Sequence, residues 1–137
     1  MDILYGWRKP FMRLRQVLLA KIHRATVTEA DVNYVGSITI DQDLMDKVGM
    51  VPGELVHVWN GTNGERLETY TIAGKRGSRI IQMNGPAALR CRVGDKIVIA
   101  AFLLTDEPEG IVPKVALVDD ENRFTGYAAP TAPAETI

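Results

Sequence analysis

Two stretches of the sequence follow the same order of predicted elements, and this repeat constrains the fold more than any other feature. Residues 39–58, TIDQDLMDKVGMVPGELVHV, and residues 80–99, IIQMNGPAALRCRVGDKIVI, each predict a strand, a short helix, a glycine–acid turn and a second strand. An offset of 41 residues aligns Gly53-Glu54 with Gly94-Asp95. Identity between the stretches is slight, so chance is the alternative to a true repeat. A true repeat predicts two pseudo-symmetric halves of one closed β-barrel, since closure removes exposed sheet edges.

Alternating apolar and polar residues between turn signals predict the remaining strands. In the longest, from Val17 to Thr28, Lys21 and His23 share one face, while Ala20 and Ile22 share the other. Further strands are expected at residues 33–41, 54–60, 66–72, 79–83 and 93–104.

Short turn and helix signals connect these strands. Asn63-Gly64 is typical of a β-hairpin turn. Asp41 can cap the N-terminus of a short helix, and Gly49 can take the left-handed conformation that ends it. Pro86 suits the first position of a helical turn over residues 84–90.

Length and composition exclude several classes of protein. A chain of 137 residues suits one domain, and a formal net charge of −1 argues against a nucleic-acid binder, which needs a basic surface. The one cysteine, Cys91, is interpreted as a buried small residue, and with only two histidines the chain argues against a zinc site. No run reaches transmembrane length, and MDILYGWRKP lacks the apolar run of a secretion signal, so no membrane contact and a cytoplasmic location are expected.

The strand predicted at NYVGSITID, residues 33–41, contains a glycine that weakens it. Gly36 can mark a β-bulge or a close approach of another backbone, which is the structural and more frequent explanation. The chemical alternative is self-cleavage, in which Ser37 Oγ attacks the preceding carbonyl carbon and converts the amide to an ester. Glycine would tolerate the strained backbone that this attack requires. Elimination and hydrolysis would then leave a pyruvoyl group at residue 37.

Other candidate residues also have a structural and a functional interpretation. Lys21 and His23 belong either to a solvated strand face or to the wall of a pocket that contacts an anion. On a later strand, Arg66 can bind a carboxylate as a planar fork and Tyr70 can donate a proton, against ordinary surface alternation. Thr69 and Tyr70 point to opposite faces of a regular strand. Both can take part in chemistry only if the strand is bulged, if it lies at a subunit interface, or if the two residues act in different steps.

Two more features favour structural roles when they are considered alone. Trp59 is interpreted as core or interface packing rather than as a ligand platform. Asn84-Gly85 is typical of a turn and helix cap, although a helix N-terminus there would also present N–H groups to an anion.

Taken together, four stretches resemble the aspartate 1-decarboxylase family, whose members are pyruvoyl-dependent. They are LLAKIHRATVTEADVNYVGSITIDQDLMD, WNGTNGERLETYTI, RGSRIIQMNG and VGDKIVIAAF, and they span roughly residues 12–104 in order. The resemblance implies a double-psi β-barrel with short helices and a homotetramer with active sites between neighbouring subunits. It also implies self-cleavage between Gly36 and Ser37 into chains 1–36 and 37–137. The implied reaction converts L-aspartate to β-alanine and CO2 for pantothenate and coenzyme A synthesis.

The resemblance implies a role for each matched residue. Ser37 becomes the covalent pyruvoyl group that forms a Schiff base with the substrate, so neither a metal nor pyridoxal phosphate is expected, and Tyr70 donates a proton. Thr69 and His23 support processing, while Asn84 and Tyr34 orient the cofactor. The implied substrate-binding residues are Arg66, Lys21, Trp59, Gly85 and Ala87.

Some features depart from the family pattern. Pro86 stands where the family usually has a small residue, and proline has no N–H for an anion, although Ala87 could still donate. Residues 1–11 precede the usual start and are expected to be an N-terminal extension, with a barrel domain at 12–104. Residues 105–137 are expected to form an outer strand at 114–119 and a flexible tail.

Two alternatives to aspartate decarboxylation remain open at the level of sequence. The first is a pyruvoyl decarboxylase for another amino acid, and the second is a non-cleaving barrel that acts as an interaction module. The sequence also leaves open whether a maturation factor assists cleavage.

Overall fold

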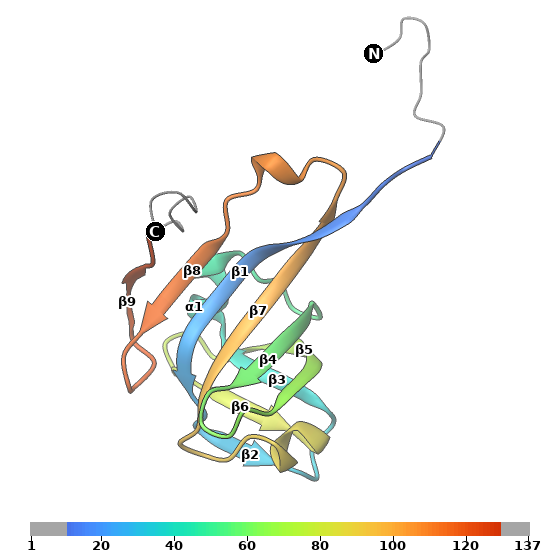
Figure 1. The fold of residues 1–137 in the computed structure, drawn as a ribbon. Helices are drawn as coiled ribbons and strands as arrows, with labels where there is room; N and C mark the ends of the chain where they lie inside the picture. The colour runs from blue at the N-terminus through green and yellow to red at the C-terminus, as the bar shows by residue number, and fades with distance from the viewer. Residues whose placement is uncertain (1–10, 130–137) are drawn as a thin grey trace, which may run out of the picture.

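The computed structural model describes residues 11–129, which form a mainly β structure with short helices (Figure 1). One α-helix, α1, spans Gln42–Val48, and two short 3₁₀ helices, η1 and η2, span Gly85–Leu89 and Pro108–Gly110. The strands are β1 Arg15–Thr26, β2 Glu29–Asp31, β3 Ser37–Asp41, β4 Leu55–Asn60, β5 Arg66–Gly74, β6 Ile81–Asn84, β7 Lys96–Thr105, β8 Lys114–Val118 and β9 Phe124–Tyr127.

The strands form one sheet that closes on itself. Its order is β2-β6-β3-β5-β4-β7-β1-β8-β9. Only two residues separate β1 from β2, and β1 pairs with β7 while β2 pairs with β6. This continuous segment therefore links the two ends of the series β6-β3-β5-β4-β7 and closes the barrel. Three pairs are parallel, namely β2 with β6, β3 with β5 and β1 with β8. The predicted mainly β barrel is therefore confirmed, and its mixed pairing agrees with the double-psi arrangement that the resemblance implies.

The internal repeat is present in the strand pairing. β3 pairs antiparallel with β6, its counterpart in the second half, and β4 pairs antiparallel with β7. β5 runs parallel to β3 and antiparallel to β4, just as β2 runs parallel to β6 and β1 antiparallel to β7. Gly53 and Gly94, aligned in the sequence, both have a positive φ, of 84° and 94°. These equivalent pairings favour a true repeat over chance, with the two halves related by a pseudo-two-fold.

The barrel interior is filled by branched aliphatic and methionine side chains. Alternation along each strand directs them inward, and the largest are fully buried. They include Ile22, Ile38, Ile40, Val56, Val58, Ile81, Met83, Ile97 and Ile99.

Asp41 ends β3, begins α1 and holds a distant loop. Its carboxylate accepts the N–H of Asp43 at 2.8 Å, so Asp41 caps the helix as predicted. The same carboxylate accepts the N–H groups of Gly77 at 3.1 Å and Arg79 at 2.7 Å. The helix ends at Gly49, which is left-handed with a φ of 80°. Because the Asp41 side chain is buried, these bonds hold the start of α1 and the loop before β6 against the end of β3.

Several predicted strand bounds were wrong. β3 begins only at Ser37, because residues 32–36 form a turn in which Asp31 accepts the N–H of Asn33 with its side chain, at 3.0 Å, and that of Tyr34 with its carbonyl oxygen, at 3.3 Å. β1 ends at Thr26, after a bulge in which Arg24 has a φ of 57°. The short strands β2 and β9 were not predicted.

The segment after β7 continues the sheet. β8 pairs with β1 within the stretch expected to form an outer strand, and β9 then pairs with β8. Asn122, which is buried, accepts the N–H of Thr26 at 2.7 Å and donates to the Thr26 carbonyl at 2.8 Å. The predicted N-terminal extension, apart from its last residue, and the end of the predicted tail lie outside the described residues.

Candidate active site

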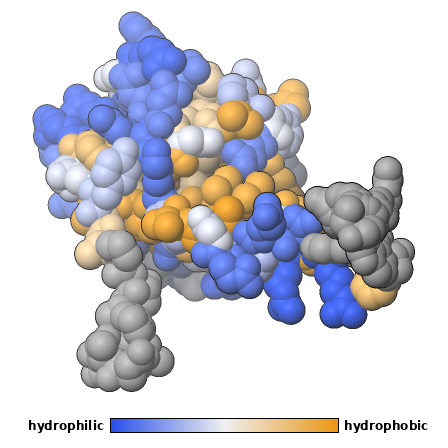
Figure 2. Space-filling view, turned by 90° about the horizontal axis from the view of Figure 1, so that it is seen from above, coloured by the Kyte–Doolittle hydropathy of each residue, from blue (hydrophilic) through white to orange (hydrophobic). Residues whose placement is uncertain are grey.

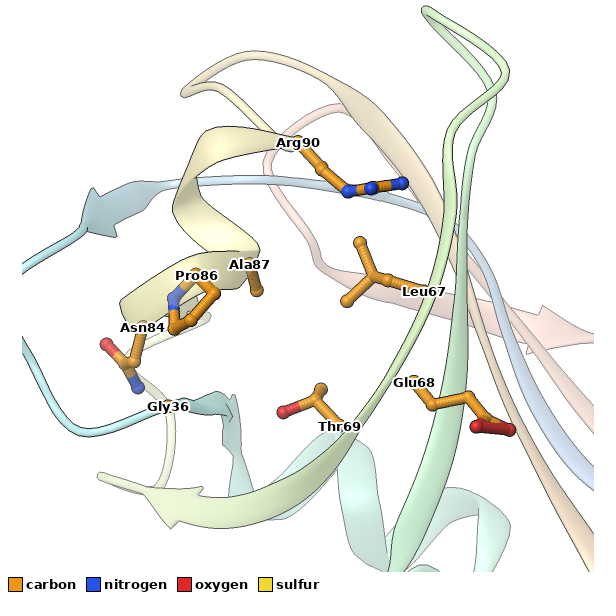
Figure 3. Close-up of a pocket in the computed structure, with 8 residues that line it drawn as sticks. All are labelled: Gly36, Leu67, Glu68, Thr69, Asn84, Pro86, Ala87 and Arg90. Atoms are coloured by element: carbon orange, nitrogen blue, oxygen red, sulfur yellow. The ribbon is translucent and has the colours of Figure 1, made fainter.

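A cavity of about 270 Å³ lies between β5, η1 and the turn that precedes β3 (Figure 3). Figure 3 shows Leu67 and Thr69 of β5 directed into it, while Glu68 between them points away. The lining residues are Gly36, Leu67, Glu68, Thr69, Asn84, Pro86, Ala87 and Arg90. Four of the predicted site residues, Gly36, Thr69, Asn84 and Ala87, therefore share one cavity.

Ser37 lies beside this cavity with no exposed surface. It pairs with Asn84 in the β3–β6 register, and Asn84 Nδ2 donates to Ser37 Oγ at 2.8 Å. The Ser37 hydroxyl donates to the Val35 carbonyl oxygen at 3.2 Å. Asn84 Nδ2 also donates to Thr39 Oγ1 at 3.0 Å, whereas its Oδ1 is a buried acceptor with no partner among the described residues. Asn84 Nδ2 is thus placed to stabilise negative charge that would develop on the serine oxygen.

Gly85 touches the backbone of Gly36. Its φ is +68°, and a Cβ at this position would lie 2.7 Å from Gly36 Cα and 2.9 Å from Gly36 N. Gly36 itself has no positive φ, so the left-handed conformation at this contact belongs to Gly85. A glycine at residue 85 is required for η1 to approach this peptide so closely.

The two faces of β5 separate the candidate residues into two groups. Thr69 is half-buried and faces the cavity, whereas Arg66 and Tyr70 are exposed on the opposite face, Tyr70 to 41%. No bulge interrupts the β4–β5 pairing, so the regular alternation that the sequence predicts is present. Within one chain, the candidate proton donor and carboxylate fork do not face the candidate cleavage site.

Lys21, Trp59 and Arg66 form a second group, here called the Trp59 cluster. Arg66 Cζ lies 4.7 Å from the centroid of the Trp59 ring, and Lys21 Nζ lies 5.9 Å from it. The indole Nε1 is buried and has no hydrogen-bond partner in the part of the chain that the structure describes. Two cations and an unused donor are therefore held together on one tryptophan, a set suited to binding a carboxylate.

His23 and Tyr34 line neither the cavity nor the Trp59 cluster, although the Tyr34 carbonyl oxygen lies close to Gly85. His23 is half-buried on β1, and burial, followed by the charges of Lys21 and Arg24, lowers its pKa, which favours the neutral imidazole. Tyr34 is 53% exposed in the turn before β3. Cys91 is fully buried, as interpreted, and burial raises the pKa of its thiol, which favours the unreactive protonated form.

Sequence reasoning did not name four of the cavity residues as site residues, namely Leu67, Glu68, Pro86 and Arg90. Leu67 has the same strand face as Thr69, a signal that alternation could have supplied. Arg90 follows η1 and its direction depends on how that helix ends, which the sequence does not specify.

Within residues 11–129, no group of three or more His, Cys, Asp or Glu side chains lies close enough to hold a metal ion. No helix among these residues is both long and apolar enough to cross a membrane.

Comparison with known proteins assigns the chain to a family. The family described as Aspartate decarboxylase matches residues 12–125. The chain belongs to the aspartate decarboxylase family. Aspartate 1-decarboxylase of Neisseria meningitidis is 55% identical over 112 residues, covering 80% of this chain and 88% of that protein. Aspartate 1-decarboxylase of Bacillus subtilis is 50% identical over 125 residues, covering 90% of this chain and 98% of that protein.

Aspartate 1-decarboxylase of Carboxydothermus hydrogenoformans is 56% identical over 110 residues, which cover 79% of this chain and 87% of that protein. A designed protein, msDPBB_sym2, is a solved structure with a TM-score of 0.39 and 20% identity, covering 64% of this chain and 99% of its own, a likeness too low to bear on the fold. The aspartate decarboxylase match extends to residue 125 and so includes β8 as well as the stretches that carry the resemblance.

Proposed function

We propose that this chain cleaves itself between Gly36 and Ser37 and that the processed protein decarboxylates L-aspartate to β-alanine and CO2 in the cytoplasm, for pantothenate synthesis. The observation that carries the proposal is the setting of Ser37. Its hydroxyl is fully buried, accepts a hydrogen bond from Asn84 Nδ2 at 2.8 Å, and adjoins a peptide that Gly85 touches. Burial and the hydrogen bond from Asn84 hold this hydroxyl in place beside the peptide that it would attack.

Self-cleavage follows from the atoms around this peptide. Ser37 Oγ forms a bond to the carbonyl carbon of Gly36, and the C–N bond breaks as its nitrogen takes a proton, which leaves an ester. Loss of the Ser37 α-proton then breaks the Cβ–Oγ bond and releases the Gly36 carboxylate. Water finally replaces the nitrogen of residue 37, which leaves as ammonia. Thr69, on the same cavity as Gly36, supports the proposal as a donor to the oxyanion of the first step.

The residues around Ser37 fit a pyruvoyl group at that position. Asn84, whose Oδ1 has no partner among residues 11–129 and whose Nδ2 already bonds to residue 37, would hold the group, and Gly85 lets the backbone of η1 lie against the peptide before it. When bound, such a group supplies a ketone that condenses with the substrate amine and accepts the electron pair released with CO2.

The chain's own residues would bind the substrate and move protons. In the Trp59 cluster, Arg66 and Lys21 would each hold one carboxylate. Two cations in one cluster therefore match a substrate with two carboxylates. Tyr70 would deliver a proton from its phenol oxygen to the substrate carbon.

Because the Trp59 cluster and the cavity lie on opposite faces of β5, we propose that the protein forms a homotetramer in which one subunit's cluster meets the neighbour's cavity. Figure 2 shows an apolar patch on the face seen from above, the end of the molecule where residues 11–14 and 104–113 lie in Figure 1. Exposed apolar side chains in these segments are Phe11, Met12, Leu14, Leu104 and Val112. A patch of this kind favours burial against a second copy.

Denaturing mass spectrometry of the purified chain tests the proposed function. Two fragments, 1–36 and 37–137, with a pyruvoyl group on the second, are expected together with β-alanine formation from aspartate. An intact chain under every condition would refute it. Cleavage of a purified precursor without added protein would also exclude the need for a maturation factor, and a panel of amino acids would define the substrate.

The proposed shared site has its own test. A Ser37→Ala chain and an Arg66→Ala chain, with different tags, are each expected to be inactive. Mixed oligomers are expected to recover activity, because some interfaces then pair an intact Ser37 with an intact Arg66. Mixed oligomers without activity would show that both residues must belong to the same subunit.

A further inference from the structure

The cavity beside Ser37 has an asymmetric lining. Gly36, Thr69 and Asn84 lie at one end, near the bond proposed to be cleaved, and Leu67 and Ala87 give the middle an apolar character. Among the described residues that line it, Arg90 is the one cation. The one acid, Glu68, points away and lies 3.3 Å from His57 on the outer face of β4. The positive charge of Arg90 is therefore not neutralised within the cavity itself.

Arg90 combines an anchored backbone with an exposed guanidinium. Its carbonyl oxygen accepts hydrogen bonds from Asn60 Nδ2 and Asn63 Nδ2, each at 3.0 Å, and Asn60 is buried. Its side chain is 56% exposed and extends across the cavity end opposite Thr69 (Figure 3). The anchored backbone keeps the guanidinium at this end, while its exposure leaves it accessible to a ligand.

Glu65 is the residue that now binds this guanidinium. Arg90 Nη1 donates to Glu65 Oε1 at 2.7 Å, and no other partner of the guanidinium is found within residues 11–129. Both side chains are about half exposed, and exposed ion pairs of this kind contribute little to stability. A carboxylate ligand can therefore replace Glu65 at little cost.

We propose that Arg90 is a specificity-determining residue that attracts the dicarboxylate substrate to the cavity and contacts one of its carboxylates after displacing Glu65. This inference rests on the proposed function, because it takes the substrate to be a dicarboxylate. It adds a cation on the Thr69 side of β5, where the chain's own Arg66 does not reach. Rim charges act mainly on the rate of association and on salt dependence, so Arg90 would affect KM rather than kcat.

Succinate, a dicarboxylate without the amine, is the probe. Its affinity is measured by calorimetry on the uncleaved Ser37→Ala chain, with Arg90→Gln as the test and Arg92→Gln as the matched control. Arg92 is an exposed arginine two residues away that lines a neighbouring groove but not this cavity. Arg90→Gln is expected to weaken succinate binding by about three- to tenfold and Arg92→Gln by less than about twofold.

Glu65→Gln tests the displacement. It frees Arg90 from its partner and is expected to tighten succinate binding by about two- to fivefold, the equivalent of an exposed ion pair. In the processed enzyme, Arg90→Gln is expected to raise the KM for aspartate at an unchanged kcat. It is also expected to reduce the dependence of KM on salt, because the attraction between Arg90 and the substrate, which salt screens, is then absent.

Equal effects of Arg90→Gln and Arg92→Gln would overturn the inference, as would a Ser37→Ala chain that does not bind succinate with Arg90 intact. A kcat that falls with KM unchanged would also overturn it. Failure of the proposed function is recognised separately, because a chain that never cleaves is detected by mass while the succinate comparison is made on uncleaved protein.

Discussion

Gly85→Ala is the substitution that most directly tests the proposed cleavage geometry. A left-handed backbone costs an L-residue roughly 1–2 kcal/mol, and the φ of Gly85 is +68°. The added Cβ would lie 2.7 Å from Gly36 Cα and 3.0 Å from the Tyr34 carbonyl oxygen. Carbon atoms in contact normally lie about 3.5–4.0 Å apart, so one backbone must move by about 1 Å. Because misplacement of a reacting group by about 1 Å costs about 100-fold in rate, self-cleavage should slow by about that factor.

The assay is a time course of cleavage by denaturing mass spectrometry, with thermal unfolding measured in parallel. Gly77→Ala and Gly94→Ala are matched controls, since both glycines have a positive φ, +77° and +94°, and a Cβ at either would meet nothing within 4 Å. They carry the same backbone strain without the contact, and should cleave at the normal rate. A Gly85→Ala chain that melts like the controls and also cleaves like them would refute the assigned contact.

Three further predictions follow from individual side chains. Asn84→Ala removes the donor to Ser37 Oγ, worth about 1 kcal/mol, and should slow self-cleavage at least about fivefold by mass spectrometry; an unchanged rate would contradict its role. The pKa of His23 lies below its ordinary 6.5, mainly through burial, so the unfolded chain binds this proton more tightly. Stability should therefore fall as the pH drops below about 6.5 towards the folded-state pKa, and the Tm of His23→Gln, measured across this range, should fall less. Asp41→Ala removes a buried carboxylate that accepts three backbone N–H groups. It should lower the free energy of unfolding, measured by urea titration, by about 2–4 kcal/mol. A loss below about 1 kcal/mol would show that other groups replace these hydrogen bonds.

The barrel was predictable because its signals are local. Alternation along β1 and β5 identified strands and faces, and a cap at Asp41 with a left-handed Gly49 identified α1, all from neighbouring residues. The turn over residues 32–36 was not predictable from propensity, because Tyr34 and Val35 favour strand. There the hydrogen bonds of Asp31 override that preference.

The site was harder to predict because its contacts are not local. The bond between Asn84 and Ser37 joins residues 47 positions apart and depends on the register of β3 against β6. Arg90 enters the cavity only because η1 ends where it does. Resemblance to a family supplied most of the candidate residues, but it could not specify which of them meet within one chain and which do not.

The setting of the peptide that we propose is cleaved depends on the closed barrel. The turn before β3 places Gly36, whereas β6 and η1 bring Asn84 and Gly85 against it from the second half of the pseudo-symmetric pair. Before β3 and β6 pair, Ser37 Oγ has neither its donor nor the neighbouring backbone that confines the peptide. The donor and the steric confinement arise together with the core, since Ile38 and Met83, opposite each other in the same register, are fully buried. Self-cleavage should therefore require the barrel to be folded first, and a substitution that unpairs β3 from β6 should abolish cleavage even where both Gly36 and Ser37 are intact.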